Sequence, residues 1–464
     1  MSIHVGEAAE APDFKKAAHV LLGNKQVRAN VRRATETIRN KRANVVGEMP
    51  DWEDLRNSAA AIKQNVLRNL DTYLEQFEAA CTKAGGKVHW ARDADEANRI
   101  SIGIIQGHQQ TEIIKVKTMT SDETRLNVAL EAAGITPWET DLADLIIQLG
   151  HDKPSHIVVP ALHKNKTEIR ELFMRTMGLT ELGSKPEDLA AAARQYLRER
   201  FLRVKVGFSG ANFAVAETGS VCVVESEGNG RMCVTLPDVM ITMLGIEKII
   251  PSFDDLEVFL QLLPRSATGE RMNPYNSIWT GVTPGDGPKE FHVILLDNGR
   301  TKVLADGESR ETLHCIRCAA CLNTCPVYRQ TGGHAYGSIY SGPIGAILTP
   351  QLQGMEHSQS LPYASSLCGA CYEVCPVKIN IPEILIHLRR RIVENGDAPQ
   401  TERIGMNMAA FTFADSKRLG VAQKLVQLGN KPMEAIALPG WSAARDMPVV
   451  PKETFREWWA GGRK

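Results

Sequence analysis

Seven of the ten cysteines lie in two tight groups whose spacing suits an iron–sulfur cofactor. The first group is Cys315-x2-Cys318-x2-Cys321-x3-Cys325, and the second is Cys368-x2-Cys371-x3-Cys375, each followed by proline. A loop with a cysteine every third residue can wrap three thiolates around one cubane cluster, while the cysteine before proline reaches a second cluster. The spacing therefore predicts iron–sulfur clusters and electron transfer.

The same ferredoxin logic assigns ligands, because the last cysteine of each run binds the other run's cluster. We expect the first cluster to be held by Cys315, Cys318, Cys321 and Cys375. The second cluster then receives only Cys325, Cys368 and Cys371, and the position where a fourth cysteine would stand is Ser365. The second site could be a three-iron cluster, or a four-iron cluster completed by Ser365, water, substrate or a partner's residue.

Two other cysteine chemistries fit less well. Structural zinc sites usually use two short cysteine pairs separated by a dozen or more residues, and four cysteines within eleven residues crowd one zinc ion. Disulfides are not expected, since nothing in the sequence looks secretory and thiols of large cytosolic proteins stay reduced.

The bulk composition is that of an ordinary globular protein. The chain has 464 residues, 43% of them hydrophobic and 23% charged, enough for two or three domains. Lys plus Arg equals Asp plus Glu at 54 each, so the charge gives no sign of nucleic acid or an anionic membrane as a partner. No signal-peptide core and no apolar stretch of about 18 residues is present. We expect a cytoplasmic protein without a transmembrane segment, which could reach a membrane through a partner or a surface patch.

Four regions are predicted along the chain. Residues 1–85 are expected to form an N-terminal helical region, and residues 86–300 an α/β domain with a largely parallel sheet. Its expected strands include Arg99–Gly103, Ser155–Pro160 and Ala214–Val224. Residues 301–395 form the cysteine module, and residues 396–464 a helical tail. No GxGxxG follows a predicted strand and no GxxxxGK[ST] occurs, so the common nucleotide sites are not indicated.

The remaining cysteines are expected to be structural. Val221–Leu236 resembles a β-hairpin around a Gly-Asn-Gly turn, with Cys222 and Cys233 in its two arms. Cys81 lies on a predicted helix with apolar neighbours. Free cysteines are often simply buried in the core, so we interpret all three in that way.

Several segments together resemble a known family. They are CIRCAACLNTCPVYRQTGGHAYGSIYSGPIGAILTP, LCGACYEVCPVKINIPEIL, KTMTSDE, HIVVPALHKNK and GFSGANFAVAETGSV, spread over about residues 110–390. They are similar to the iron–sulfur B-type proteins of the three-component lactate utilisation system. Such proteins pair an LUD domain, similar in fold to the ribose-phosphate isomerase and CoA-transferase group, with a ferredoxin-like module.

This resemblance implies a role in oxidising L-lactate to pyruvate together with two other proteins, of the A and C types. It also implies two [4Fe-4S] clusters, the second with three cysteine ligands, and onward transfer of electrons to a quinone or another acceptor. The chain would then be a non-catalytic or co-catalytic subunit of an oxidoreductase complex.

Two other functions stay open on the sequence alone. The chain could be a self-contained 2-hydroxy-acid dehydrogenase similar to glycolate oxidase, or a redox-sensing scaffold. Polar candidates in the α/β region are Glu217, Lys117 and His163, but the resemblance names no mechanism, so no catalytic residue is assigned.

Overall fold

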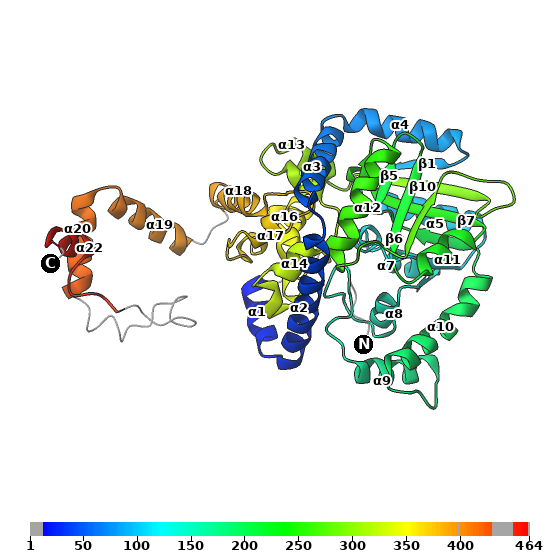
Figure 1. Ribbon diagram of the computed structural model, residues 1–464, viewed down its shortest axis with the longest axis horizontal. Coiled ribbons are helices and arrows are strands. Elements are labelled where there is room, and N and C mark those ends of the chain that lie inside the picture. Colours follow the sequence, from blue (N-terminus) through cyan, green and yellow to red (C-terminus); the bar gives the residue numbers. More distant parts are fainter. Residues whose placement is uncertain (1–12, 397–399, 429–448, 463–464) are drawn as a thin grey trace. The chain divides into compact units, whose positions relative to one another are not determined.

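The computed structural model describes residues 13–396, 400–428 and 449–462 (Figure 1). The chain divides into two compact units, residues 1–391 and 392–464. The first unit holds the sheets and all the cysteines. Within the described residues, no helix combines the length and apolar character needed to cross a bilayer.

The first unit is organised around a six-stranded sheet in which every neighbouring pair is parallel. In spatial order its strands are β1 (Lys87–Ala91), β10 (Glu290–Leu296), β7 (Val239–Gly245), β4 (Val206–Ser209), β2 (Glu112–Lys115) and β3 (Thr136–Glu139). The predicted α/β class with a largely parallel sheet is confirmed.

Both faces of this sheet are covered, and the central strands are therefore apolar throughout. All seven residues of β7 are buried. Met240 and Leu244 face a core shared with α4 (Leu70–Lys83), whereas Ile241 and Met243 face a core shared with α5 (Ala94–Gly107) and α7 (Leu126–Ala132). Such continuous hydrophobic runs are typical of parallel strands between two helical layers.

A second, four-stranded sheet packs beside the first. Its order is β8 (Ile249–Ile250), β5 (Phe213–Val215), β6 (Ser220–Glu225) and β9 (Tyr275–Trp279). Strands β5 and β6 are antiparallel, and Gly219, at φ 68°, lies in the turn between them. A Cβ at Gly219 would lie 2.2 Å from the Cys81 backbone nitrogen, so this turn needs glycine for space as well as for conformation.

The other helices of the α/β region begin and end at recognisable signals. Helix α9 begins with a capping box of Asn165 and Glu168 and ends at Gly178, which adopts the left-handed conformation. Further elements are α6 (Met119–Glu123), α8 (Leu142–Leu149), α9 (Lys166–Met177), α10 (Pro186–Arg203), α11 (Asn229–Thr235), the short 3₁₀ helix η1 (Ile246–Lys248) and α12 (Phe253–Ala267).

The N-terminal helices pack between the α/β region and the cysteine segment. They are α1 (Phe14–Leu22), α2 (Lys25–Gly47) and α3 (Trp52–Arg68). Helix α2 contacts α12 on one side and the cysteine-segment helices α14 (Ala320–Thr324) and α15 (Tyr328–Thr331) on the other. Figure 1 shows α1 and α2 alongside this segment.

The cysteine segment consists of short helices joined by loops. Besides α14 and α15 it contains α13 (Arg300–Ala305), η2 (Arg310–His314), η3 (His334–Tyr336), α16 (Gly342–Gln353), η4 (Met355–His357), η5 (Leu361–Tyr363), α17 (Ala370–Glu373) and α18 (Ile381–Glu394). The second unit contains α19 (Gln400–Phe413), α20 (Ser416–Leu428) and α22 (Phe455–Ala460). The domain boundaries predicted at residues 85, 300 and 395 stay predictions.

Four local predictions were wrong. Ala214–Val224, expected as one strand, contains parts of the antiparallel strands β5 and β6 and the turn between them. The expected second hairpin arm within Val221–Leu236 is helix α11, because Glu225 accepts the backbone N–H groups of Gly228 and Arg231 and turns the chain into a helix. Arg99–Gly103 lies inside α5, where its apolar residues face the core at helical spacing. Ser155–Pro160 forms a loop, closed by the Ser155 N–H donating to the Pro160 carbonyl.

A buried ionic network joins the α/β region to the cysteine segment. The Glu247 carboxylate accepts from Arg300 Nε, and its other oxygen accepts from Arg317 at 3.1 Å. Arg300 also donates to both oxygens of Glu123, at 2.8 and 2.9 Å, and Tyr340 donates to Glu123 at 2.6 Å. Burial alone would raise the pKa of Glu247, but the positive charges of Arg300 and Arg317 lower it to about 2.

This network predicts that Glu247→Gln is strongly destabilising. The substitution removes the charge but keeps the shape, and leaves buried Arg317 without its carboxylate. Breaking one member of a buried ion pair typically costs about 3–5 kcal/mol. We expect an anaerobic urea titration followed by circular dichroism to show a clear fall in the unfolding midpoint.

Glu48→Gln is the matched control. It breaks the surface pair with Arg271, in which both side chains are exposed, and should leave the midpoint near that of the unmodified protein. Equal unfolding midpoints for Glu247→Gln and Glu48→Gln would contradict a structural role for the network.

Candidate thiol sites and pocket

The structure gathers Cys315, Cys318, Cys321 and Cys375 around one cavity. Three of these thiols are buried and Cys315 is half-buried, and all ten cysteines of the chain are free. Burial raises the pKa of each of Cys318, Cys321 and Cys375, and mutual repulsion among the sulfurs adds to this effect. Thiols so placed ionise readily only when a metal stabilises the thiolate form.

The other three cysteines of the two groups form a second set. Burial raises the pKa of Cys371 to about 12, and the neighbouring sulfurs of Cys325 and Cys368 contribute to the increase. Cys371 also raises the pKa of Cys321, which indicates that the two sets are adjacent. The grouping in space matches the grouping expected from the spacing, and the ligand assignment stays a prediction.

Backbone groups around the sulfurs suit an iron–sulfur cofactor. Arg317 N donates to Cys315 Sγ at 3.4 Å, Tyr328 N to Cys325 Sγ at 3.5 Å, and Ile379 N to Cys375 Sγ at 3.4 Å. Hydrogen bonds of this kind stabilise thiolate ligands and tune the potentials of clusters. The donor set therefore fits the group, with three or four thiols and aligned N–H donors at each site.

Two arginines from the N-terminal helices fix the loop that carries Cys375. Arg56 donates to the carbonyls of Cys375 at 2.9 Å and Tyr372 at 3.2 Å, and Arg42 donates to the Val374 carbonyl at 3.1 Å. Their positive charges would also offset the negative charge of a thiolate-bound cluster. Helices α2 and α3 are therefore part of the first thiol site, which sequence reasoning did not anticipate.

The second thiol set lies nearer the surface. Cys368 is exposed, as are its neighbours Leu367 and Tyr372. Ser365 Oγ accepts the Leu367 N–H at 3.1 Å, and the Ser365 carbonyl accepts from Arg389 at 3.2 Å. Ser365 is thus engaged in local hydrogen bonds, and the fourth ligand of this site stays open among the alternatives given above.

The glycine-rich segment between the two cysteine groups packs against protein backbone. A Cβ at Gly333 would lie 2.0 Å from the Ser155 carbonyl oxygen, and one at Gly345 would lie 2.0 Å from the Tyr340 carbonyl oxygen. Close approach of these chain segments explains why glycine stands at both positions.

A separate pocket of about 210 Å³ lies at the carboxyl ends of strands β2 and β4. Its walls include residues 116–120 after β2 and residues 210–212 after β4. From β2 the chain continues to β3 on one side. From β4 it first enters β5 and β6 of the second sheet and then returns to β7 on the other side. Parallel sheets characteristically bind ligands at such a switch point.

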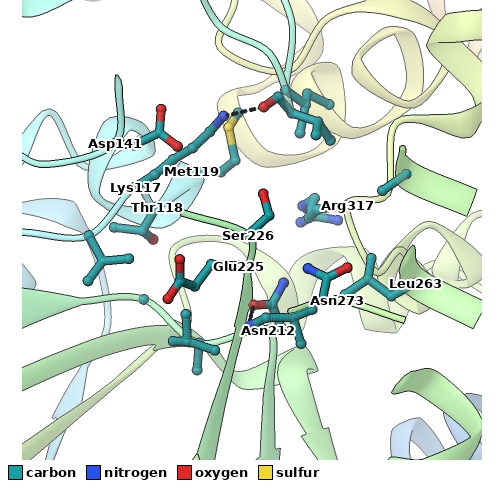
Figure 2. A pocket seen from close by; sticks show the side chains of 18 of the residues that line it. Lys117, Thr118, Met119, Asp141, Asn212, Glu225, Ser226, Leu263, Asn273 and Arg317 are labelled. Atoms are coloured by element: carbon teal, nitrogen blue, oxygen red, sulfur yellow. Dashed lines mark hydrogen bonds between the residues drawn. The ribbon is translucent and has the colours of Figure 1, made fainter. Parts of the chain in front are cut away.

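Three cations and three carboxylates line this pocket. Asp141 and Glu225 lie toward the left of Figure 2 and Arg317 toward the right, with Ser226 between them. The remaining charged residues of the lining are Lys117, Lys248 and Glu227. The formal charge of the lining therefore cancels, but the charges are distributed unevenly.

The acidic groups are largely used for local structure. Asp141 accepts the N–H groups of Ala143 and Asp144 at the start of α8, and Glu227 accepts the Leu142 N–H at 3.0 Å. Glu225 holds the turn before α11, as described above. Lys117 donates to the Val158 carbonyl at 2.8 Å, the contact drawn in Figure 2.

Lys248 differs from these groups. It is half-buried, lines the pocket, and has no hydrogen bond or ion pair with any other residue of the described ranges. Burial and the nearby charge of Arg317 lower the pKa of its ammonium group to about 8, although the charges of Glu247 and Cys315 act in the opposite direction. A desolvated cation without a partner indicates a place where an anion would be stabilised.

Arg317 belongs to both sites. It stands between Cys315 and Cys318 in the chain and lines both the thiol cavity and the pocket. Its φ of 61° belongs to the left-handed region, and its ion pair with Glu247 holds it there. The pocket and the first thiol site therefore share a wall one residue thick.

The structure places the polar candidates Lys117, Glu217 and His163 in different surroundings. Lys117 lies in the pocket. Glu217 is exposed and accepts the Phe253 N–H at the start of α12, outside the pocket lining. The sequence missed Lys248 and Arg317, although a charged residue inside the first cysteine run was a signal that could have identified Arg317.

His163 takes part in a triad-like arrangement that is structural. Its Nδ1 lies 2.7 Å from Ser155 Oγ and its Nε2 lies 3.1 Å from Asp152. The Ser155 hydroxyl, however, is buried and donates to the Pro160 carbonyl. A nucleophile must be accessible and must give its proton to the histidine, so this arrangement closes the loop and does not catalyse acyl transfer.

The cysteines outside the two groups are buried in the α/β region, as expected. Burial raises the pKa of Cys81 to about 11 and of Cys222 and Cys233 to about 12, and no sulfur of the two sets contributes to these shifts. We therefore expect Cys222→Ala and Cys233→Ala each to keep the iron content per chain of the unmodified protein. Each loses one buried sulfur, at a cost of about 1–2 kcal/mol.

Iron analysis on anaerobically purified protein, with the urea midpoint measured in parallel, checks this prediction. A loss of iron in a variant that still folds would make that cysteine a ligand.

Two protein families match separate parts of the chain. The LUD domain family matches residues 74–296, and the 4Fe-4S dicluster domain family matches residues 311–379. A lactate utilization protein B from Bacillus licheniformis is 44% identical, over 97% of this chain and 97% of its own. The lactate utilization protein B of Bacillus subtilis is 43% identical, over 99% and 98%.

Two further matches are informative in different degrees. A protein of Escherichia coli named uncharacterized electron transport protein YkgF is 42% identical, over 96% of each chain. A crystal structure of a DUF162 family protein from Deinococcus radiodurans covers 49% of this chain and 98% of its own, at 14% identity and a TM-score of 0.28, which is too low to carry an argument.

Proposed function

The chain belongs to the lactate utilization protein B family, and on that premise we propose that it is the iron–sulfur electron-transfer subunit of a complex that oxidises L-lactate to pyruvate. The observation that carries the proposal is the gathering of seven cysteines into two adjacent sets. Two centres close together favour conduction through the chain, whereas a redox sensor needs only one.

In this proposal the ligands are those expected from the spacing. Cys315, Cys318, Cys321 and Cys375 hold one [4Fe-4S] cluster, and Cys325, Cys368 and Cys371 hold a second. The donor set and the N–H groups aimed at the sulfurs support this assignment. A four-iron second cluster would need a fourth ligand from outside the cysteine set, whereas a three-iron cluster would not.

The electron count requires other components. Lactate loses two electrons and two protons on becoming pyruvate, whereas each cluster carries one electron. The chain shows no flavin or nicotinamide fingerprint, so a two-electron acceptor such as a flavin is supplied by the partners, which are the A- and C-type proteins of the system. The protons leave to solvent, and the electrons pass singly through this chain to a quinone or a comparable acceptor.

The burial of the two thiol sets supports a direction of flow. The first set lies inside the protein, beside the pocket at the end of the sheet. The second includes the exposed Cys368, with exposed Leu367 and Tyr372 close by. Electrons would enter at the first cluster and leave from the second, where an acceptor can approach.

A self-contained 2-hydroxy-acid dehydrogenase is the second candidate, because the pocket of the α/β region adjoins the first thiol site. Low-temperature EPR with iron and sulfide analysis separates the two functions. We expect about eight irons per chain, or about seven if the second cluster has three, and reduction by L-lactate only when the partner proteins are present. Reduction of the isolated chain by lactate would favour the dehydrogenase.

Single substitutions test the ligand assignment. Cys318→Ser should remove the signal of the first cluster and abolish lactate turnover with an acceptor downstream, because electrons lose their entry point. Cys325→Ser should remove the other signal, and Cys222→Ala serves as the control that keeps both. Unchanged turnover in Cys318→Ser would refute conduction through this chain.

A further inference from the structure

We infer that the pocket at the carboxyl ends of β2 and β4 is a binding site for a small 2-hydroxy or 2-oxo monocarboxylate, with the carboxylate held by Lys248 beside the first thiol site. The inference deepens the proposed function and rests on it for the identity of the acid. It would place in this chain the substrate-docking site of the complex, while the two-electron acceptor remains on a partner.

The position of the pocket favours a ligand site over a packing defect. It opens beyond the carboxyl ends of β2 and β4, where parallel sheets characteristically bind ligands, and α12 borders it through Leu263, Pro264 and Ala267. Its lining also combines the loops after β2 and β4, strand β6 of the second sheet and Arg317 of the cysteine segment. A ligand there would touch the α/β region and the loop of the first cluster at the same time.

The charges of the lining select the ligand class. Lys248 offers an ammonium group without a partner among the described residues, and carboxylates form strong charge-assisted hydrogen bonds with such groups. The opposite wall carries Asp141, Glu225 and Glu227, which would repel a dianion such as a phosphate ester. A monoanion can pair its carboxylate with Lys248 and turn a neutral hydroxyl or carbonyl end toward the acidic wall, where it is not repelled.

Neutral polar groups between these walls can form hydrogen bonds with the hydroxyl or carbonyl end of the ligand. Ser226 and Asn273 line the pocket, and Asn212 does so with its amide oxygen already engaged by the Val224 N–H at 2.8 Å. Its amide nitrogen is thus left as a donor. A cavity of about 210 Å³ has room for an acid of a few carbon atoms.

The shared wall has a consequence for the cluster. Arg317 lines the pocket and its backbone N–H donates to Cys315 Sγ. An anion bound beside Lys248 would change the electrostatic field at the first cluster and would lie close enough for magnetic coupling to it. Binding is therefore measurable without any turnover.

The test uses pyruvate labelled with ¹³C in its carboxylate and full-length, cluster-loaded protein reduced with dithionite. Pulsed EPR should detect a saturable ¹³C coupling to the reduced cluster signal. Lys248→Gln should need at least tenfold more pyruvate for half saturation, with iron content unchanged. Lys302→Gln, which alters an exposed lysine of α13, is the matched control and should behave like the unmodified protein.

Asn273→Asp provides a second variant in case Lys248→Gln does not fold. It adds a negative charge to the lining and should also weaken pyruvate binding at least tenfold. Absence of a ¹³C coupling at saturating pyruvate, or equal binding in a folded Lys248→Gln variant, overturns the inference. Equally strong competition by inorganic phosphate overturns the selection for a monocarboxylate.

These outcomes are separable from those of the proposed function. Pyruvate coupling in a protein whose clusters lactate never reduces, with or without partners, would sustain the site and refute the electron-transfer role. Reduction of the clusters by lactate in the complex, without pyruvate coupling, would sustain the electron-transfer role and refute the binding site.

Discussion

The buried carboxylate of Glu247 is the constraint on which the arrangement of the protein depends. It comes from the 3₁₀ turn after the central strand β7 and pairs with Arg300 and with Arg317 of the first cysteine loop. Two buried guanidinium groups cannot remain without counter-charges, so the cysteine loop must dock where the sheet ends. The α/β region and the thiol sites therefore form one compact unit.

Docking at that edge has a functional consequence, because parallel sheets open their ligand sites there. Arg317 is held by Glu247 in a left-handed backbone conformation and separates the pocket from the first thiol set. On the other side, Arg56 of α3 fixes the carbonyl of Cys375. The pocket, the buried thiols and the exposed Cys368 thus follow one another along a path from the interior to the surface, as an electron carrier requires.

Much of the fold and of the thiol sites could be predicted from the sequence. The features that could not be predicted all depend on contacts that form only in the folded chain. The cysteine spacing is local, so it predicted both sets, and the alternation of apolar runs predicted the parallel sheet. The prediction of a second hairpin strand was wrong because the Glu225 side chain accepts backbone N–H groups at the start of a helix, and strand propensity does not describe such contacts. Lys248 was missed for a similar reason, since an isolated lysine becomes notable only when the fold buries it without a partner.

We propose that electrons from lactate enter at the first cluster and leave from the second. Rapid freeze-quench EPR of the assembled complex, after mixing with L-lactate in the absence of a final acceptor, tests this order directly. With this order of transfer, the signal lost in Cys318→Ser should appear first and the signal lost in Cys325→Ser should follow. Reduction of the second cluster first, or of neither within the time of one turnover, would contradict it.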